Sequence, residues 1–237
     1  MAKSCLLVLI CCLLLNPICA GEKVIKDEEG MDCWVYFPDE IDSGKTYWLV
    51  VGVHGLGGKG KGASGVAKWV TQEGDCIVIG PSFNDGYQMG NGKNADKLKR
   101  LFKDLKKEYK LHDRMFVHGF SAGAQFVHRF AFNEPNLIAG VSAHSAGSWA
   151  TRGYGKISLR AKKIPFAISC GEKDTGKSYE SAPLGRLAWF KEFRDELDKK
   201  KFDVESAVVP GVKHRQSPKA RELAKNCYAR AKAAFSK

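Results

Sequence analysis

The sequence predicts an α/β fold in which helices cover both faces of a mostly parallel sheet. Two observations support this prediction. Short apolar runs rich in β-branched and aromatic residues alternate with longer segments that carry apolar residues at helical spacing, and this alternation is typical of parallel sheets. The expected strands are residues 33–37, 47–53, 76–80, 115–119, 138–143, 165–170 and 204–209. The expected helices are residues 64–71, 95–109, 122–132, 184–199 and 218–235.

The segments differ in ways that support their assignments. The strand over residues 47–53 is almost continuously apolar, which suits a strand covered on both faces. The helix over residues 95–109 has leucines at helical spacing on one face and lysines on the other. The long irregular stretches are residues 84–94 and 146–163, and binding sites usually lie on loops of that length.

The length and the first residues of the chain predict its domain organisation. A chain of 237 residues with 44% hydrophobic residues can fill one core, so we expect a single globular domain over residues 21–237. Residues 1–20 combine Lys3 with an apolar run and end at Ala20, as a secretory signal peptide does. That run is about half as long as a membrane-spanning helix requires. The mature protein is therefore expected to be secreted or periplasmic, with lipidation of Cys19 as the alternative.

Export would leave four cysteines: Cys33, Cys76, Cys170 and Cys227. They could form disulfides in three pairings or remain buried thiols, and the sequence does not choose among these outcomes. No cysteine lies in a CxxC pair or at ligand spacing from a histidine, so no structural zinc is expected.

The chain is basic, with a formal charge of +12 that falls by one when Lys3 leaves with the signal peptide. Much of this charge lies in residues 97–110 and 199–201, within or at the end of predicted helices, as on a solvated helix face. No aromatic residues alternate with the basic ones, and no nucleic-acid-reading motif is present. A nucleic-acid partner is therefore not expected, whereas attraction to anionic polysaccharide is compatible with the charge.

Residues 119–123 read GFSAG and match the pattern GxSxG between a predicted strand and a predicted helix. In this setting small flanking residues permit a strained turn that exposes the serine hydroxyl. We therefore predict that Ser121 is a nucleophile.

A nucleophilic serine requires a general base, and the base requires an acid that fixes its tautomer. Both follow Ser121 in the chain, each shortly after a predicted strand. Asp174 ends the segment GEKD and His214 ends the segment GVKH. Asp174 is the predicted acid and His214 the predicted base, with Glu172 and Glu180 as alternative acids.

The other histidines around the nucleophile are weaker candidates for the base. His128 lies inside the helix after Ser121, and His118 lies inside the strand before it. His112 lies at the far end of that strand, so all three are expected to be structural. His144 ends a strand on the active edge but precedes the acid in the chain, so it is expected to line the substrate site.

Two loops are expected to supply the amides that stabilise the oxyanion. One amide belongs to Ala122, directly after the nucleophile. The second belongs to Leu56, in the glycine-rich turn HGLGG over residues 54–58. This turn lacks the GKS or GKT ending of a phosphate-binding loop.

The site is expected to be open. Strands and a loop fill the interval between Ser121 and Asp174, which leaves no room for a cap domain. An open site suits a bulky or polymeric ester. The expected walls of the substrate groove are Phe83, Tyr87, His144 and Trp149.

The segments HGLGG, GFSAG, HSAGS, GEKD and GVKH together resemble the secreted esterases related to polyhydroxybutyrate depolymerases and to feruloyl and acetylxylan esterases. The resemblance spans residues 47–214. It implies an α/β-hydrolase fold, ester hydrolysis without a cofactor, and Ser121, Asp174 and His214 as the catalytic triad. The helix over residues 184–199 and the loop over residues 84–94 carry no substrate-defining motif, so the resemblance does not specify the acyl and alcohol groups of the ester.

The leading hypothesis is a secreted serine hydrolase that cleaves carboxylic esters through an acyl-enzyme on Ser121. A serine peptidase of the same fold would use the same residues. An inactive hydrolase fold that serves as a binding protein is the alternative from a different functional class. A lipase is disfavoured because no long lid segment lies between the predicted strands.

Overall fold

The computed structural model describes residues 21–62, 73–84 and 86–236. The predicted signal peptide with Cys19 and the predicted helix over residues 64–71 lie outside the described residues. The strands are β1 (Glu22–Lys26), β2 (Asp32–Tyr36), β3 (Tyr47–Val53), β4 (Cys76–Pro81), β5 (Leu111–Phe120), β6 (Ile138–His144), β7 (Phe166–Gly171) and β8 (Val204–Val209). The α-helices are α2 (Gly92–Glu108), α3 (Ala122–Asn133), α4 (Arg186–Lys199) and α5 (Pro218–Phe235), and the 3-10 turns are η2 (Tyr87–Met89), η3 (Pro135–Leu137) and η4 (Leu159–Ala161).

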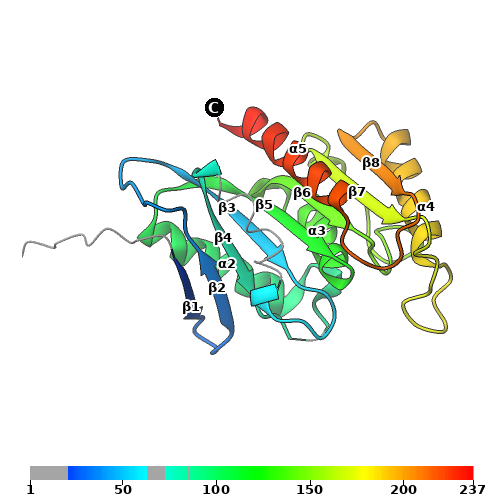
Figure 1. Cartoon of the computed structure of the whole chain (residues 1–237), viewed down its shortest axis with the longest axis horizontal. Coiled ribbons are helices and arrows are strands. Elements are labelled where there is room, and N and C mark those ends of the chain that lie inside the picture. Colours follow the sequence, from blue (N-terminus) through cyan, green and yellow to red (C-terminus); the bar gives the residue numbers. More distant parts are fainter. Residues whose placement is uncertain (1–20, 63–72, 85, 237) are drawn as a thin grey trace, which may run out of the picture.

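All of these strands form one eight-stranded sheet in the order β1-β2-β4-β3-β5-β6-β7-β8. The six strands from β4 to β8 in this order run parallel, whereas β1 and β2 pair antiparallel at one edge. Figure 1 shows β1 at one end of the sheet and β8 at the other. The predicted mostly parallel sheet is confirmed. Strand β1 was not predicted, because its sequence EKVIK mixes lysines with only two β-branched residues on an exposed edge.

Helices cover both faces of the sheet, as predicted. Helices α2, α3 and α4 contribute their buried residues to the larger apolar core on one face. Helix α5 packs on the other face, where the ring of Tyr228 lies 5.3 Å from that of Phe116 on β5. Figure 1 shows α5 running across the sheet from the β8 side. Between β6 and β7 the chain forms only irregular structure and η4, so no cap domain is inserted there.

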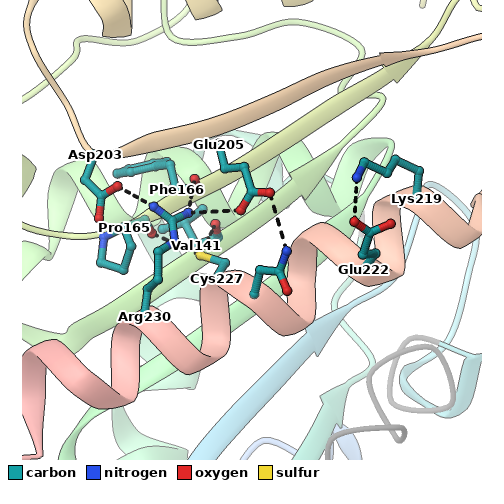
Figure 2. A network of polar contacts seen from close by, with 10 residues as sticks. Val141, Pro165, Phe166, Asp203, Glu205, Lys219, Glu222, Cys227 and Arg230 are labelled. Carbon is teal, nitrogen blue, oxygen red and sulfur yellow. Dashed lines mark hydrogen bonds and ion pairs between the residues drawn. The ribbon is translucent and has the colours of Figure 1, made fainter.

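Polar contacts fix α5 against the strands that it crosses (Figure 2). The guanidinium of Arg230 pairs with Asp203 and donates to the carbonyl of Phe166 at 3.1 Å. The thiol of Cys227 contacts the carbonyls of Val141 at 3.4 Å and Pro165 at 3.3 Å. These contacts tie α5 to β6, to the start of β7 and to the residue before β8.

The four cysteines of the described chain are buried thiols that are not joined in disulfides. Burial raises the pKa of the Cys76, Cys170 and Cys227 thiols to about 12 and raises that of Cys33 further. These thiols are therefore protonated at neutral pH and are poor nucleophiles. Within the described ranges there is no group of side chains suited to hold a metal ion, and no helix there is long and apolar enough to cross a membrane.

Candidate active site

Ser121 lies at the turn between β5 and α3, in a backbone conformation that residues other than glycine rarely adopt. Its φ is 57° and its ψ is −118°, so the backbone is strained at this residue. The amide of Ser121 donates to the carbonyl of His144 at 2.9 Å, which ties the turn to the end of β6. The predicted strand–turn–helix setting is present.

Two glycines allow α3 to start directly on the sheet. A Cβ at Gly119 would lie 2.4 Å from the carbonyl carbon of Gly123. A Cβ at Gly123 would lie 2.1 Å from the carbonyl oxygen of Val53 on β3. Such distances are far below van der Waals contact, so this packing requires glycine at both positions.

The substitution Gly123→Ala is therefore expected to lower the free energy of unfolding by at least about 2 kcal/mol, since the added methyl group meets backbone atoms that cannot move freely. Urea unfolding monitored by circular dichroism measures the effect. Gly62→Ala is the matched control, because a Cβ there would have open space around it. Equal stability of both variants would contradict the predicted role of Gly123.

The structure brings the three predicted triad residues together. Nε2 of His214 lies 3.0 Å from Oγ of Ser121, and Nδ1 of His214 lies 2.8 Å from Oδ2 of Asp174. His214 lies in the connection between β8 and α5, and Asp174 follows β7. This arrangement lets Nδ1–H donate to the carboxylate while Nε2 accepts from the serine hydroxyl.

The carboxylate of Asp174 is buried and held by further contacts. Its Oδ1 accepts from Arg186 at 3.4 Å, and the thiol of Cys170 lies 3.8 Å from its Oδ2. The ring of Phe120 packs against the imidazole of His214 with centroids 4.8 Å apart. The acid and the base are therefore positioned by neighbours from several elements.

The alternative acids lie elsewhere. Oε2 of Glu172 accepts from the amide of Gly211 at 2.8 Å, which ties the loop after β7 to the loop that carries His214. Glu180 is exposed. Among the described residues, Asp174 is the carboxylate that contacts the His214 ring.

Three other histidines contact groups outside the triad. The Nδ1 atoms of His118 and His128 contact Ser142 Oγ at 3.0 Å and the Ala124 carbonyl at 2.6 Å. His112 stacks on Trp48 with centroids 4.0 Å apart. Burial lowers the pKa of His118 to about 4 and lowers that of His128 well below its usual value, so both are neutral at pH 7.

Both predicted oxyanion segments lie beside Ser121. Ala122 is the first residue of α3, where backbone amides have no partner within the helix. A Cβ at Gly55 would lie 3.7 Å from Cβ of Ser121, so the turn that contains Leu56 lies against the nucleophile. The side chain of Leu56 is exposed, and the predicted role concerns its backbone amide alone.

The predicted walls of the substrate groove are wrong. The side chains of Phe83, Tyr87, His144 and Trp149 are all at least 95% buried. Phe83 and Tyr87 pack on Phe126 of α3, and Trp149 stacks on Phe193 with centroids 4.7 Å apart. His144 contacts two serine hydroxyls at 2.7 Å. Their loop positions were evident from the sequence, but the inward direction of their side chains was not.

Arg129 is a buried cation on α3 that was not predicted from the sequence. Its guanidinium donates to the carbonyls of Tyr154 at 2.6 Å and Gln88 at 3.0 Å, and to Oγ of Ser148 at 3.0 Å. Burial lowers its pKa to about 10, so it stays charged at neutral pH. Arg129 thereby ties both long loops beside the site to α3. The sequence signal for a buried arginine was its position inside the largely apolar stretch of residues 126–132.

The parallel sheet with its strand order, and the serine at a strained turn between β5 and α3, define an α/β-hydrolase fold. No protein-family model matches the sequence, and no curated protein matches it significantly. Solved structures do match across nearly the whole chain.

One similar structure is poly(aspartic acid) hydrolase-1 from Sphingomonas sp. KT-1, with a TM-score of 0.65 and 21% identity over 90% of this chain and 97% of that one. A second is the poly(3-hydroxybutyrate) depolymerase LpqC from Bordetella parapertussis, with a TM-score of 0.66 and 19% identity over 92% of this chain and 90% of that one. A third is a ferulic acid esterase from Anaeromyces mucronatus, with a TM-score of 0.61 and 17% identity over 90% of both chains.

Proposed function

We propose that this chain is a serine hydrolase that cleaves carboxylic esters through an acyl-enzyme on Ser121. The observation that carries the proposal is the continuous hydrogen-bonded chain from Ser121 through His214 to the buried carboxylate of Asp174. A serine hydroxyl that contacts an oriented imidazole is the arrangement that activates it for attack on a carbonyl carbon.

In the proposed reaction, Nε2 of His214 takes the proton of Ser121 as Oγ bonds to the ester carbonyl carbon. The amides of Ala122 and Leu56 stabilise the resulting oxyanion. The C–O bond to the alcohol then breaks, and His214 donates its proton to the leaving alkoxide. Water, deprotonated by the same imidazole, attacks the acyl-enzyme and releases the acid and Ser121. Asp174 stabilises the imidazolium in both halves of the cycle.

The names of two similar solved structures, a poly(3-hydroxybutyrate) depolymerase and a ferulic acid esterase, support an ester as the substrate. The absence of an inserted domain between β6 and β7 supports a site open to bulky or polymeric esters. The signal-peptide pattern of residues 1–20 supports action outside the cytoplasm.

The mature protein is expected to hydrolyse 4-nitrophenyl acetate with a burst of 4-nitrophenolate of about one equivalent per enzyme, since with this activated aryl ester acylation is expected to be faster than deacylation. The burst is measured by stopped-flow absorbance. Asp174→Asn is expected to lower kcat by about 10⁴-fold, because the imidazole then adopts the wrong tautomer.

Two other results would contradict this proposal. Comparable kcat/KM values for an ester and for a peptide 4-nitroanilide would indicate a peptidase. A folded protein that turns over neither substrate would indicate an inactive hydrolase fold that binds its ligand.

A further inference from the structure

We propose that a cavity next to Ser121 binds a carboxylate group of the substrate, so that the preferred esters carry a free acid. This inference rests on the proposed ester hydrolysis and specifies its substrate class. The cavity has a volume of about 190 Å³, and its walls include Gly55, Lys59, His118, Phe120 and Gln216.

The cavity lies beside the reacting atoms. Phe120 directly precedes Ser121 and packs on His214, and Gln216 follows His214 by two positions. Gly55 belongs to the turn that lies against the Cβ of Ser121. A volume of this size corresponds to roughly six water molecules, which suffices for a carboxylate on a short carbon chain. A group attached to a bound ester can therefore reach the cavity.

Two residues of the cavity wall, His118 and Gln216, carry buried polar side-chain atoms that have no hydrogen-bond partner in the described part of the chain. These atoms are Nε2 of His118 and both Nε2 and Oε1 of Gln216. A buried polar atom without a hydrogen bond is costly, so these atoms favour a polar occupant. The amide Nε2–H₂ of Gln216 is a donor, and Phe120 and Val53 supply apolar surface for the carbon chain that carries the polar group.

A chain of buried hydrogen bonds leads from His118 into the sheet. Its Nδ1 contacts Ser142 Oγ at 3.0 Å, Ser142 Oγ contacts Nε2 of His144 at 2.7 Å, and Nδ1 of His144 contacts Ser169 Oγ at 2.7 Å. Each hydroxyl can donate only once, so all three bonds must run in one direction. With Ser169 donating first, the chain leaves Nε2–H of His118 as a donor without a partner, on a residue of the cavity wall. An anionic occupant selects this direction.

Lys59 supplies the charge that favours an acid over a neutral polar group. Its side chain is exposed at the wall of the cavity, and it forms no ion pair within the described ranges. Lys59 also borders a second pocket, whose walls include the carboxylates of Asp32 and Glu29. These carboxylates form ion pairs with other cations: Lys26, Lys97 and Arg100. Lys59 therefore remains available to a carboxylate of the substrate.

The loops around the triad are also basic. Lys213 and Arg215 flank His214, and Lys173 precedes Asp174. These three side chains are exposed and have no ion pair among the described residues. Their positive potential attracts anions to the mouth of the site at low ionic strength.

The test compares mono-4-nitrophenyl glutarate with its neutral glutaramate analogue, in which an amide replaces the carboxylate. The expected kcat/KM is on the order of tenfold higher for the glutarate ester, because hydrogen bonds to its charged carboxylate are stronger than those to the neutral amide. Lys59→Met is expected to abolish most of this ratio. Lys103→Met, an exposed lysine on α2 without an ion pair in the described structure, is the matched control and should retain it. Glutarate ion is expected to inhibit hydrolysis of 4-nitrophenyl acetate competitively.

Equal kcat/KM values for the two glutaryl substrates, together with no inhibition by glutarate, would overturn the carboxylate site while leaving ester hydrolysis intact. The same ratio of kcat/KM values for the glutarate and glutaramate esters in Lys59→Met as in Lys103→Met would also overturn the carboxylate site. Failure of the protein to cleave 4-nitrophenyl acetate at all is a different result, because it would contradict the proposed function itself.

Discussion

Replacement of Ser121 by alanine is expected to lower kcat for ester hydrolysis by about 10⁴-fold or more, since no acyl-enzyme can then form. The fold should persist, because the serine side chain contacts His214 and carries no part of the apolar core. Initial rates with 4-nitrophenyl acetate give the loss of activity, and circular dichroism checks the fold.

Ser43→Ala is the matched control for this substitution. Ser43 is exposed on the turn before β3, at the opposite end of the strands from Ser121. The control should retain full activity. Ester hydrolysis by Ser121→Ala at a rate within tenfold of the unsubstituted protein would contradict the role of Ser121.

The free energy of unfolding is expected to fall between pH 7 and pH 5, because buried histidines are neutral in the fold. Burial lowers the pKa of His118 to about 4 and lowers the pKa values of His128 and His144 well below the usual value. In the unfolded chain each imidazole takes up a proton near pH 6.5, so the unfolded state binds more protons and stability rises with pH. His118 alone is expected to account for about 2 kcal/mol of the loss at pH 5.

Urea unfolding at pH 7 and at pH 5 measures this dependence. His128→Leu removes one buried imidazole, so the difference between the two pH values should shrink. Phe130→Leu alters a buried residue of the same helix without changing a titratable group, and it should leave the difference unchanged. Equal stability of the unsubstituted protein at both pH values would show that these histidines do not remain neutral in the fold.

Most of the fold could be predicted because its strands and helices are strongly patterned. Strands β3 and β8 and helix α5 have the predicted bounds, since continuous apolar runs and helical spacing mark them clearly. Strand β1 lacks such a pattern because its side chains lie at an exposed edge. The state of the four cysteines could not be predicted, because it depends on distances between strands that the sequence does not contain.

The positions of the triad residues could be predicted from the sequence, whereas the walls of the substrate groove could not. Ser121, Asp174 and His214 follow strands that run parallel, so their shared edge of the sheet follows from topology alone. The substrate walls were wrong because the direction of a loop side chain depends on tertiary packing. Arg129 was missed for the same reason, since its partners are backbone carbonyls of two distant loops.

The central claim is that Ser121 is an activated nucleophile. It is tested most directly by treating the mature protein with a fluorophosphonate probe and locating the label by mass spectrometry, with Ser121→Ala treated in parallel. We expect stoichiometric labelling at Ser121 in the unsubstituted protein and no label at any site in the variant. A folded, unsubstituted protein that remains unlabelled at Ser121 would contradict the claim.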